Sequence, residues 1–341
     1  MEANITKNLL NNSNYDFLRQ NEHLGKNIIL LGFGGSHAYG TNVEGSDIDV
    51  RGVATLRPHE ILTNQNFEQV EDRATDTVVY SFNKLVSLLY NSNPNVVELL
   101  GLKKEHYLYL NEIGQELIDN ADMFLSKRAA QSFGGYAYAQ LRRLDNKSAR
   151  TLAQKEQEEH ILHSIENAKY TFPSKYFEFP EDAINLYVDK AIQEGYDTEI
   201  FMDINLHHYP LRDYKSMWAE MHNVVKEYSK IGKRNSNAIE HNKLGKHMMH
   251  LVRLYLMGID ILQDGKIITY REKEHDLLMS IRNGDFLKDN VPTKEFRNMV
   301  DDLQVRFEKA KEKNYLPDKP DYQRINNFMI KVNKEVIMKE Q

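Results

Sequence analysis

A glycine-serine turn followed by two acidic residues is the part of the chain best suited to chemistry: after Gly35-Ser36 come ten residues and then Asp47 and Asp49. Glycine lets backbone N–H groups approach phosphate oxygens closely, and the Ser36 hydroxyl adds a donor. Residues i and i+2 of an extended strand point to the same side, so Asp47 and Asp49 are expected to present both carboxylates to one point. Carboxylate oxygens suit Mg²⁺, which commonly shares its ligands with phosphate groups. The pattern therefore predicts a site that holds a nucleoside triphosphate together with a divalent metal.

Side chains that flank the turn are candidate contacts for the nucleotide. They are His37, Tyr39, Thr41 and Arg51. Arg51 lies two residues beyond Asp49, so on a regular strand it shares that face and can pair with a carboxylate or a phosphate. His37 directly follows Ser36, and it either faces a phosphate or caps the short helix after the turn.

The elements expected around the turn are those of a small unit of strands and helices. Residues 27–31 are predicted to form a buried strand that runs into the turn, and residues 76–80 a further strand. Ser81 is expected to cap a helix over residues 82–90. Because strands and helices alternate, residues 1–110 are predicted to form an α/β or α+β domain that carries the turn.

Residues 111–341 are predicted to form a second, helical domain that supplies the other wall of the substrate cleft. Helical spacing recurs in the segments 111–122, 124–145, 151–171, 212–230, 238–262, 273–283, 293–313 and 321–338. Two short runs in this domain, residues 200–204 and 266–270, are expected to be strands.

Two helix faces of this second domain carry basic side chains. Lys246, His250 and Arg253 follow one another at i, i+4 and i+7, so they share a face. This face either contacts the triphosphate tail and the acceptor phosphates or is a solvated charged stripe. A second face is predicted to bind nucleic acid through stacking and phosphate contacts. It comprises Lys127, Arg128, Tyr136, Gln140 and Arg143.

Composition limits the class of protein. The chain has 341 residues, of which 41% are hydrophobic and 28% charged, as in ordinary globular proteins. Its formal net charge of −6 argues against a non-specific DNA-coating protein, and the lack of cysteine excludes disulfides and thiolate metal sites. There is no apolar run of about 18 residues and no secretory signal, so no membrane partner and a cytoplasmic location are expected.

The acidic motif also carries a family resemblance. Gly35-Ser36 with Asp47-Ile48-Asp49 ten residues further on resembles the signature of the DNA polymerase beta superfamily of nucleotidyltransferases. A narrower branch, predicted bacterial and phage nucleotidyltransferases associated with RNA repair, is similar over more of the chain. That similarity lies in residues 35–41, 46–52, 93–100, 246–254, 277–284 and 316–321. The resemblance implies an α+β fold: a polymerase-beta-like catalytic domain with a small mixed sheet and flanking helices, followed by a mainly helical domain.

The same resemblance implies a third carboxylate on a neighbouring strand. Asp76, at the start of the strand predicted for residues 76–80, is the candidate, and Asp72, Glu71 and Glu98 are the alternatives. In this interpretation the catalytic acids bind two Mg²⁺ ions, with Mn²⁺ as an alternative metal, and the third acid helps to activate the attacking hydroxyl. The implied metal ligands are Asp47, Asp49 and Asp76.

The implied activity is transfer of a nucleoside monophosphate from an NTP to an acceptor hydroxyl, with release of pyrophosphate. An RNA 3′ end is the preferred acceptor, with tRNA as its class. Three other functions stay open: nucleotidylation of a protein by a toxin–antitoxin type enzyme, transfer to a small molecule, and nucleotide or RNA binding without catalysis. The residue pattern does not select the base that is transferred or an oligomeric state.

Overall fold

The computed structural model describes most of the chain. The described residues are 9–63, 65–149, 154–169, 172–176, 178–180, 182–192, 198–225, 241–288 and 291–339.

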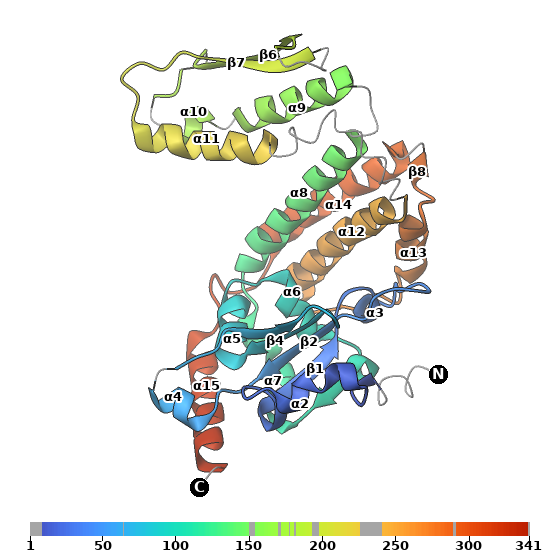
Figure 1. The fold of residues 1–341 in the computed structure, drawn as a ribbon, viewed down its shortest axis with the longest axis vertical. Coiled ribbons are helices and arrows are strands. Elements are labelled where there is room, and N and C mark those ends of the chain that lie inside the picture. Colours follow the sequence, from blue (N-terminus) through green and yellow to red (C-terminus); the bar gives the residue numbers. More distant parts are fainter. Residues whose placement is uncertain are drawn as a thin grey trace. The chain divides into compact units, whose positions relative to one another are not determined.

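The chain divides into two compact units (Figure 1). Unit 1 comprises residues 1–141, 245–287 and 293–341, and unit 2 comprises residues 142–244 and 288–292. Unit 1 therefore contains both the glycine-serine turn and the C-terminal helices. The boundary predicted near residue 110 lies inside unit 1, and as a division between catalytic and cleft-forming parts it stays a prediction.

A five-stranded mixed sheet forms the centre of the N-terminal part of unit 1. Its strand order is β3-β4-β2-β1-β5, in which β2 and β4 are parallel and the other neighbours antiparallel. The strands are β1 (Ile28–Phe33), β2 (Val50–Ala54), β3 (Gln69–Asp72), β4 (Thr77–Ser81) and β5 (Tyr107–Leu110). β1 is buried along its whole length, as its apolar sequence predicts, whereas buried and half-buried residues alternate along β4. The ends of β1 and the start of β2 bring the turn and the acidic motif together.

Helices cover the sheet and build the rest of unit 1. They are α2 (Phe17–Gln20), α3 (Gly35–Tyr39), α4 (Pro58–Thr63), α5 (Phe82–Tyr90), α6 (Pro94–Val97), α7 (Glu112–Asp119), α12 (His241–Asp264), α13 (His275–Asn283), α14 (Lys294–Lys313) and α15 (Tyr322–Lys339), with α8 (Arg128–Ala149) and α12 each crossing the boundary between the units. Short 3₁₀ turns lie between them: η1 (Ser13–Tyr15), η2 (Gly25–Asn27), η3 (Glu98–Gly101), η4 (Lys104–His106) and η5 (Ala121–Phe124). Figure 1 shows α8, α12 and α14 running side by side. The Phe307 ring of α14 lies close to two glycines: a Cβ added at Gly134 of α8 would be 3.3 Å from the ring, and one added at Gly258 of α12 would be 2.6 Å from it.

Local helix signals are satisfied where the sequence places them. The Ser81 hydroxyl accepts a hydrogen bond from the Lys84 backbone N–H at 3.1 Å, which confirms the predicted cap of α5. Pro58 and Pro94 stand at the first positions of α4 and α6, where the missing N–H has no helical partner in any case.

The strand predicted over residues 266–270 is wrong. This segment follows α12 as irregular chain, and it packs onto η3. The Thr269 backbone N–H donates to the Gly101 carbonyl at 3.2 Å, and its hydroxyl donates to the Glu98 carbonyl at 2.6 Å. These contacts satisfy the polar groups of the apolar run without a strand ladder.

Unit 2 has its own small core. A β-hairpin of β6 (Ile184–Lys190) and β7 (Thr198–Ile204) packs with α9 (Gln154–Lys169), α10 (Phe172–Lys175) and α11 (Leu211–Val225). β7 confirms the strand predicted for residues 200–204. Buried side chains of Ile165, Phe172 and Met217 lie in this core. A second two-stranded sheet consists of β8 (Leu287–Lys288) and β9 (Val291–Pro292).

The predicted fold class is confirmed: a small mixed sheet with flanking helices is followed by a mainly helical region. Among the described residues, no helix is both long enough and apolar enough to cross a membrane.

Candidate active site

The glycine-serine turn lies directly against the acidic motif. Gly35 has a φ of +52°, in the left-handed region that favours glycine, and a Cβ added there would be 1.9 Å from Oδ2 of Asp49. The Gly34 backbone N–H donates to the Asp49 carbonyl at 2.8 Å. Any side chain at residue 35 would therefore displace the Asp49 carboxylate. The sequence-predicted association of turn and carboxylate is a direct contact in the structure.

Asp49 and Asp76 form a pair of carboxyl groups, and Arg51 contacts both. Nη2 of Arg51 is 3.5 Å from Oδ1 of Asp49 and 3.2 Å from Oδ1 of Asp76. The same guanidinium donates through Nη1 to the Asp76 carbonyl at 2.5 Å. Asp76 immediately precedes β4 with a φ of 45°, and the Val50 backbone N–H donates to its carbonyl. Arg51 thus lies on the face of Asp49, as its two-residue spacing predicts.

The two carboxyl groups perturb each other's ionisation. Burial, together with the hydrogen bond and negative charge of Asp76, raises the pKa of Asp49 to about 6, against the opposing charges of Arg51 and Lys246. The hydrogen bond from Asp49 holds the pKa of Asp76 below its usual value. The pair therefore takes up a proton at a higher pH than an isolated carboxyl group would, although Arg51 is in contact with both.

Asp47 has different surroundings from Asp49, and neither residue lies on a strand. β2 begins only at Val50, and the side chain of Asp47 is exposed whereas that of Asp49 is largely buried. In the part of the chain that the structure describes, no group of three or more His, Asp or Glu side chains is arranged to hold a metal ion. Residues 47–49 precede the paired strand, so the expectation that both carboxylates face one point stays a prediction.

The alternatives for the third carboxylate lie elsewhere. Asp72 accepts hydrogen bonds from the backbone N–H and hydroxyl of Thr75, each at 2.8 Å, and Glu71 contacts Gln69 on the edge strand β3. Glu98 is buried in the cluster described next. Asp76 is therefore the candidate that the fold places beside Asp49.

A buried cluster behind the turn contains Tyr39, Glu98 and Arg253. Nη1 of Arg253 is 2.8 Å from Oε2 of Glu98, and the Tyr39 hydroxyl donates to Oε1 of Glu98 at 2.8 Å. The Arg253 guanidinium carbon lies 3.5 Å from the centre of the Tyr39 ring. These contacts join α3, η3 and α12. Tyr39 and Arg253, predicted as nucleotide contacts, have partners within the fold, and a role at the nucleotide stays a prediction.

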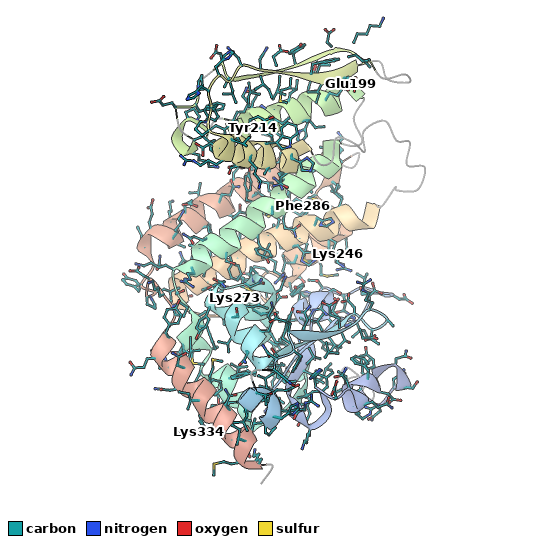
Figure 2. All side chains as sticks on the ribbon, turned by 60° about the vertical axis from the view of Figure 1, so that its left-hand side comes forward. Glu199, Tyr214, Lys246, Lys273, Phe286 and Lys334 are labelled. Carbon is teal, nitrogen blue, oxygen red and sulfur yellow. The ribbon has the colours of Figure 1, made fainter. Side chains whose placement is uncertain are left out.

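The other predicted nucleotide contacts lie around this cluster. The His250 ring packs edge-on against Tyr39 with centroids 5.7 Å apart, and burial together with the charge of Arg253 lowers the pKa of His250 well below 6.5. Lys246, labelled on α12 in Figure 2, is exposed, and its charge acts on Asp49.

Two polar atoms near the turn are buried without a hydrogen-bond partner. They are Nε2 of His37 and Oγ1 of Thr41. Thr41 is fully buried, and its backbone N–H donates to the Ser36 carbonyl at 2.9 Å.

The predicted nucleic-acid face of α8 is partly used by the fold. Nζ of Lys127 pairs with Asp318 at 2.7 Å, and Nη1 of Arg128 donates to the Tyr90 carbonyl at 3.0 Å. The Tyr136 ring is half-exposed, and its hydroxyl accepts from Asn93 at 3.3 Å. Oε1 of Gln140 is buried without a partner in the described structure, and the side chain of Arg143 lies outside the described residues. Binding of nucleic acid here stays a prediction.

Sequence reasoning missed the contribution of α13. Nη2 of Arg282 donates to the Ser46 hydroxyl at 3.2 Å, and Nε2 of His275 lies 2.8 Å from the Gly40 carbonyl oxygen. Two residues of the loop between α3 and β2, Gly40 and Ser46, are thus bonded to α13. The segment 277–284 enters the family resemblance, but no spacing within it indicates that Arg282 contacts a loop more than 200 residues earlier.

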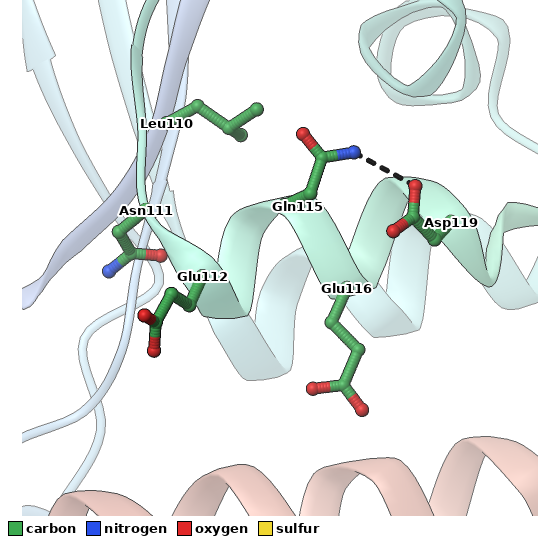
Figure 3. Close-up of a pocket in the computed structure, with 6 residues that line it drawn as sticks. All are labelled: Leu110, Asn111, Glu112, Gln115, Glu116 and Asp119. Carbon is green, nitrogen blue, oxygen red and sulfur yellow. Dashed lines mark hydrogen bonds between the residues drawn. The ribbon is translucent and has the colours of Figure 1, made fainter.

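A separate pocket lies along α7 (Figure 3), with a volume of about 370 Å³. Its lining includes the carboxylates of Glu112, Glu116 and Asp119, and Gln115 donates to Asp119 at 2.8 Å. None of the predicted site residues lines it. Its acidic lining is unsuited to a polyphosphate.

Comparison with known proteins finds one family model that matches the N-terminal part of the chain. Residues 10–163 match the model of a family described as RlaP, the RNA repair pathway DNA polymerase beta family. No curated protein and no solved structure matches the chain. The matched range contains the whole five-stranded sheet and the acidic pair, and it ends before α12 and α13.

Proposed function

Because residues 10–163 belong to the RNA repair pathway DNA polymerase beta family, we propose that the protein is a metal-dependent nucleotidyltransferase. It transfers the nucleoside monophosphate of an NTP to an RNA 3′ hydroxyl and releases pyrophosphate. The preferred acceptor class is tRNA. The family description supports RNA as the acceptor, and the site geometry supports the reaction type.

The observation that carries the proposal is the contact between Gly35 and Asp49. Phosphoryl transfer needs little covalent chemistry from the protein and depends on positioning and charge. A turn that can approach phosphate oxygens must therefore lie within reach of the acidic ligands. The 1.9 Å distance between an added Gly35 Cβ and Oδ2 of Asp49 shows how closely the two are packed.

The donor set fits Mg²⁺ at the carboxylate pair. Asp49 and Asp76 offer hard oxygen ligands, and these two carboxylates face a single guanidinium, that of Arg51. These two residues would hold the ion, and Asp47, two residues before Asp49, would be a further oxygen ligand. When bound, Mg²⁺ supplies Lewis-acid stabilisation of the developing phosphoryl charge.

The remaining steps belong to the protein's own groups. Ser36 and the glycine backbone orient the triphosphate, and the exposed Lys246 adds a positive charge at the acidic pair. Asp76, whose pKa lies below its usual value, can accept a hydrogen bond from the acceptor hydroxyl and orient it toward the α-phosphate. Arg51 keeps both carboxylates in place through its contacts on β2 and at the start of β4.

The proposal is tested by incubating the purified protein with Mg²⁺, total RNA and each α-labelled NTP in turn. Label is expected in RNA with the wild-type protein and is expected to fall at least 100-fold in Asp49→Asn and Asp76→Asn. Asp119→Asn, the same change in the separate pocket along α7, is the matched control and should retain activity. Undiminished labelling in both site variants would refute the proposal, and label on polypeptide instead of RNA would replace the acceptor.

A further inference from the structure

Arg282 is a buried cation near the turn with an unused donor. The residue is 8% exposed and lies on α13. Its Nη2 donates to the Ser46 hydroxyl, whereas Nη1 is buried and has no hydrogen-bond partner among the described residues. A guanidinium has five N–H donors, and each one buried without an acceptor destabilises the fold.

No carboxylate compensates the charge of Arg282 within the described structure. The other buried arginines of unit 1 differ in this respect: Arg253 pairs with Glu98, and Arg271 pairs with Asp260 at 2.6 Å and also with a second carboxylate. Burial lowers the pKa of Arg282, and no acidic group opposes this effect. An isolated buried cation is costly, so an anion absent from the chain itself would be a fitting partner.

The position of Arg282 connects it to the proposed nucleotide site. Ser46, its hydroxyl partner, directly precedes Asp47 in the loop that follows the glycine-serine turn. Helix α12 also approaches Arg282 closely, because a Cβ added at Gly245 of α12 would lie 2.4 Å from the Arg282 carbonyl oxygen. The next residue of α12 is Lys246, whose charge acts on Asp49.

We propose that Arg282 binds the polyphosphate tail of the nucleoside triphosphate, an inference that rests on the proposed function. Planar guanidinium donors match phosphate oxygens, and a polyphosphate offers acceptors to several donors at once. The buried hydroxyl of Thr41, on the same loop as Ser46, is a second donor without a partner. Arg282 binds and positions the tail and the departing pyrophosphate, and it makes no covalent contribution.

The inference predicts opposite signs for stability and binding. Replacing Arg282 with methionine, which has similar length and no charge, removes an uncompensated buried cation, so the Tm of the ligand-free protein should stay the same or rise. Affinity for polyphosphate should fall. A purely structural arginine would show a lower Tm, because its loss would release the loop at Ser46.

The experiment measures Tm by thermal unfolding and affinity by calorimetry for wild type, Arg282→Met and Arg282→Lys. The probes are inorganic tripolyphosphate in EDTA, ATP with Mg²⁺, and an RNA oligonucleotide with a 5′ hydroxyl. Arg282→Met is expected to bind tripolyphosphate and ATP at least tenfold more weakly with an unchanged or higher Tm, and Arg282→Lys should lie between. Arg271→Met, a buried arginine with carboxylate partners, is the matched control and should lower Tm.

Three results would overturn the inference. Wild-type affinity for tripolyphosphate and ATP in Arg282→Met overturns it and leaves the proposed function standing. A lower Tm or a failure to fold in Arg282→Met would show that the residue has a structural role. Loss of RNA binding alone in this variant would show that Arg282 contacts RNA instead of the polyphosphate. If the wild-type protein binds neither tripolyphosphate nor ATP, the inference and the proposed function fail together.

Discussion

Replacing Glu98 with glutamine tests the cluster that holds the glycine-serine turn against α12. Glu98 accepts hydrogen bonds through both carboxylate oxygens, one from Tyr39 and one from Arg253. Glutamine keeps one acceptor but presents an amide nitrogen to the other donor, and it removes the counter-charge of Arg253. The side chains of Arg253 and Glu98 are only 5% and 12% exposed, so solvent compensates little of this loss.

The expected size follows from the burial of the pair. Breaking a buried ion pair by neutralising one partner typically costs about 3–5 kcal/mol of unfolding free energy. For a compact unit of this size, about 2–4 °C of Tm is lost per kcal/mol, so Glu98→Gln should lower the Tm of unit 1 by roughly 10 °C. The variant is also expected to lose nucleotide affinity, because Tyr39 ends the short helix that begins at the turn.

Urea denaturation followed by far-UV circular dichroism measures the loss, and hydrogen exchange of amides in α12 and η3 assigns it to unit 1. Arg253→Met and the double variant complete a double-mutant cycle. The double variant should be at least 1.5 kcal/mol more stable than the sum of the single losses implies, as about 0.5–3 kcal/mol is typical of residues in contact. A loss below about 1 kcal/mol in Glu98→Gln, or strict additivity in the cycle, would refute this account of the cluster.

Two further predictions concern the turn and a second buried carboxylate. Gly35→Ala should abolish labelling of RNA and destabilise unit 1 by about 1–2 kcal/mol, because residue 35 has a positive φ and the new Cβ would collide with Asp49. The control is Gly135→Ala, whose Cβ meets nothing within 4 Å, and this variant should keep its activity. Burial alone would raise the pKa of Glu60, but hydrogen bonds from Arg57 outweigh this effect and lower the pKa below 4.5. The contribution of Glu60 to the free energy of unfolding is therefore present above pH 4.5 and is lost as the pH falls through the lowered pKa. Denaturation at pH 3–6 should show a slope of at most about 1.4 kcal/mol per pH unit from this group, and Glu60→Gln should flatten it; an unchanged slope would exclude Glu60 as its source.

The elements that sequence predicts correctly are those with local signals. The helix 82–90 begins at a serine cap and carries a regular apolar face, and α5 has the same bounds. Strands β3, β5 and β6 were not predicted, since they are short or half-exposed and are defined by pairing with distant chain. The run 266–270 has strand composition, but tertiary contacts with η3 override its propensity.

The contacts of the candidate site also divide into those that local spacing predicts and those that depend on distant parts of the chain. The contacts among Asp49, Arg51 and the turn follow from short spacings. Asp76 was predicted because the family resemblance implies a third carboxylate on a neighbouring strand. The environment of Asp47 was not predictable from spacing, because the start of β2 depends on pairing with β1 and β4. Arg253 lies 155 residues from its partner Glu98, and Arg282 lies 236 residues from its partner Ser46, so only the fold can reveal these contacts.

The unbalanced charges of unit 1 constrain what the proposed site can bind. Asp49 and Asp76 carry more negative charge than Arg51 compensates, whereas Arg282 carries a positive charge that no described carboxylate compensates. The two excesses lie near the same end of one loop, because Arg282 binds Ser46 a few residues before Asp49 and β2. A lone anion would satisfy Arg282 but be repelled by the carboxylates, and a lone cation would do the reverse. A divalent metal bound to a polyphosphate presents both signs in one ligand, so it is the ligand class that compensates both excesses at once.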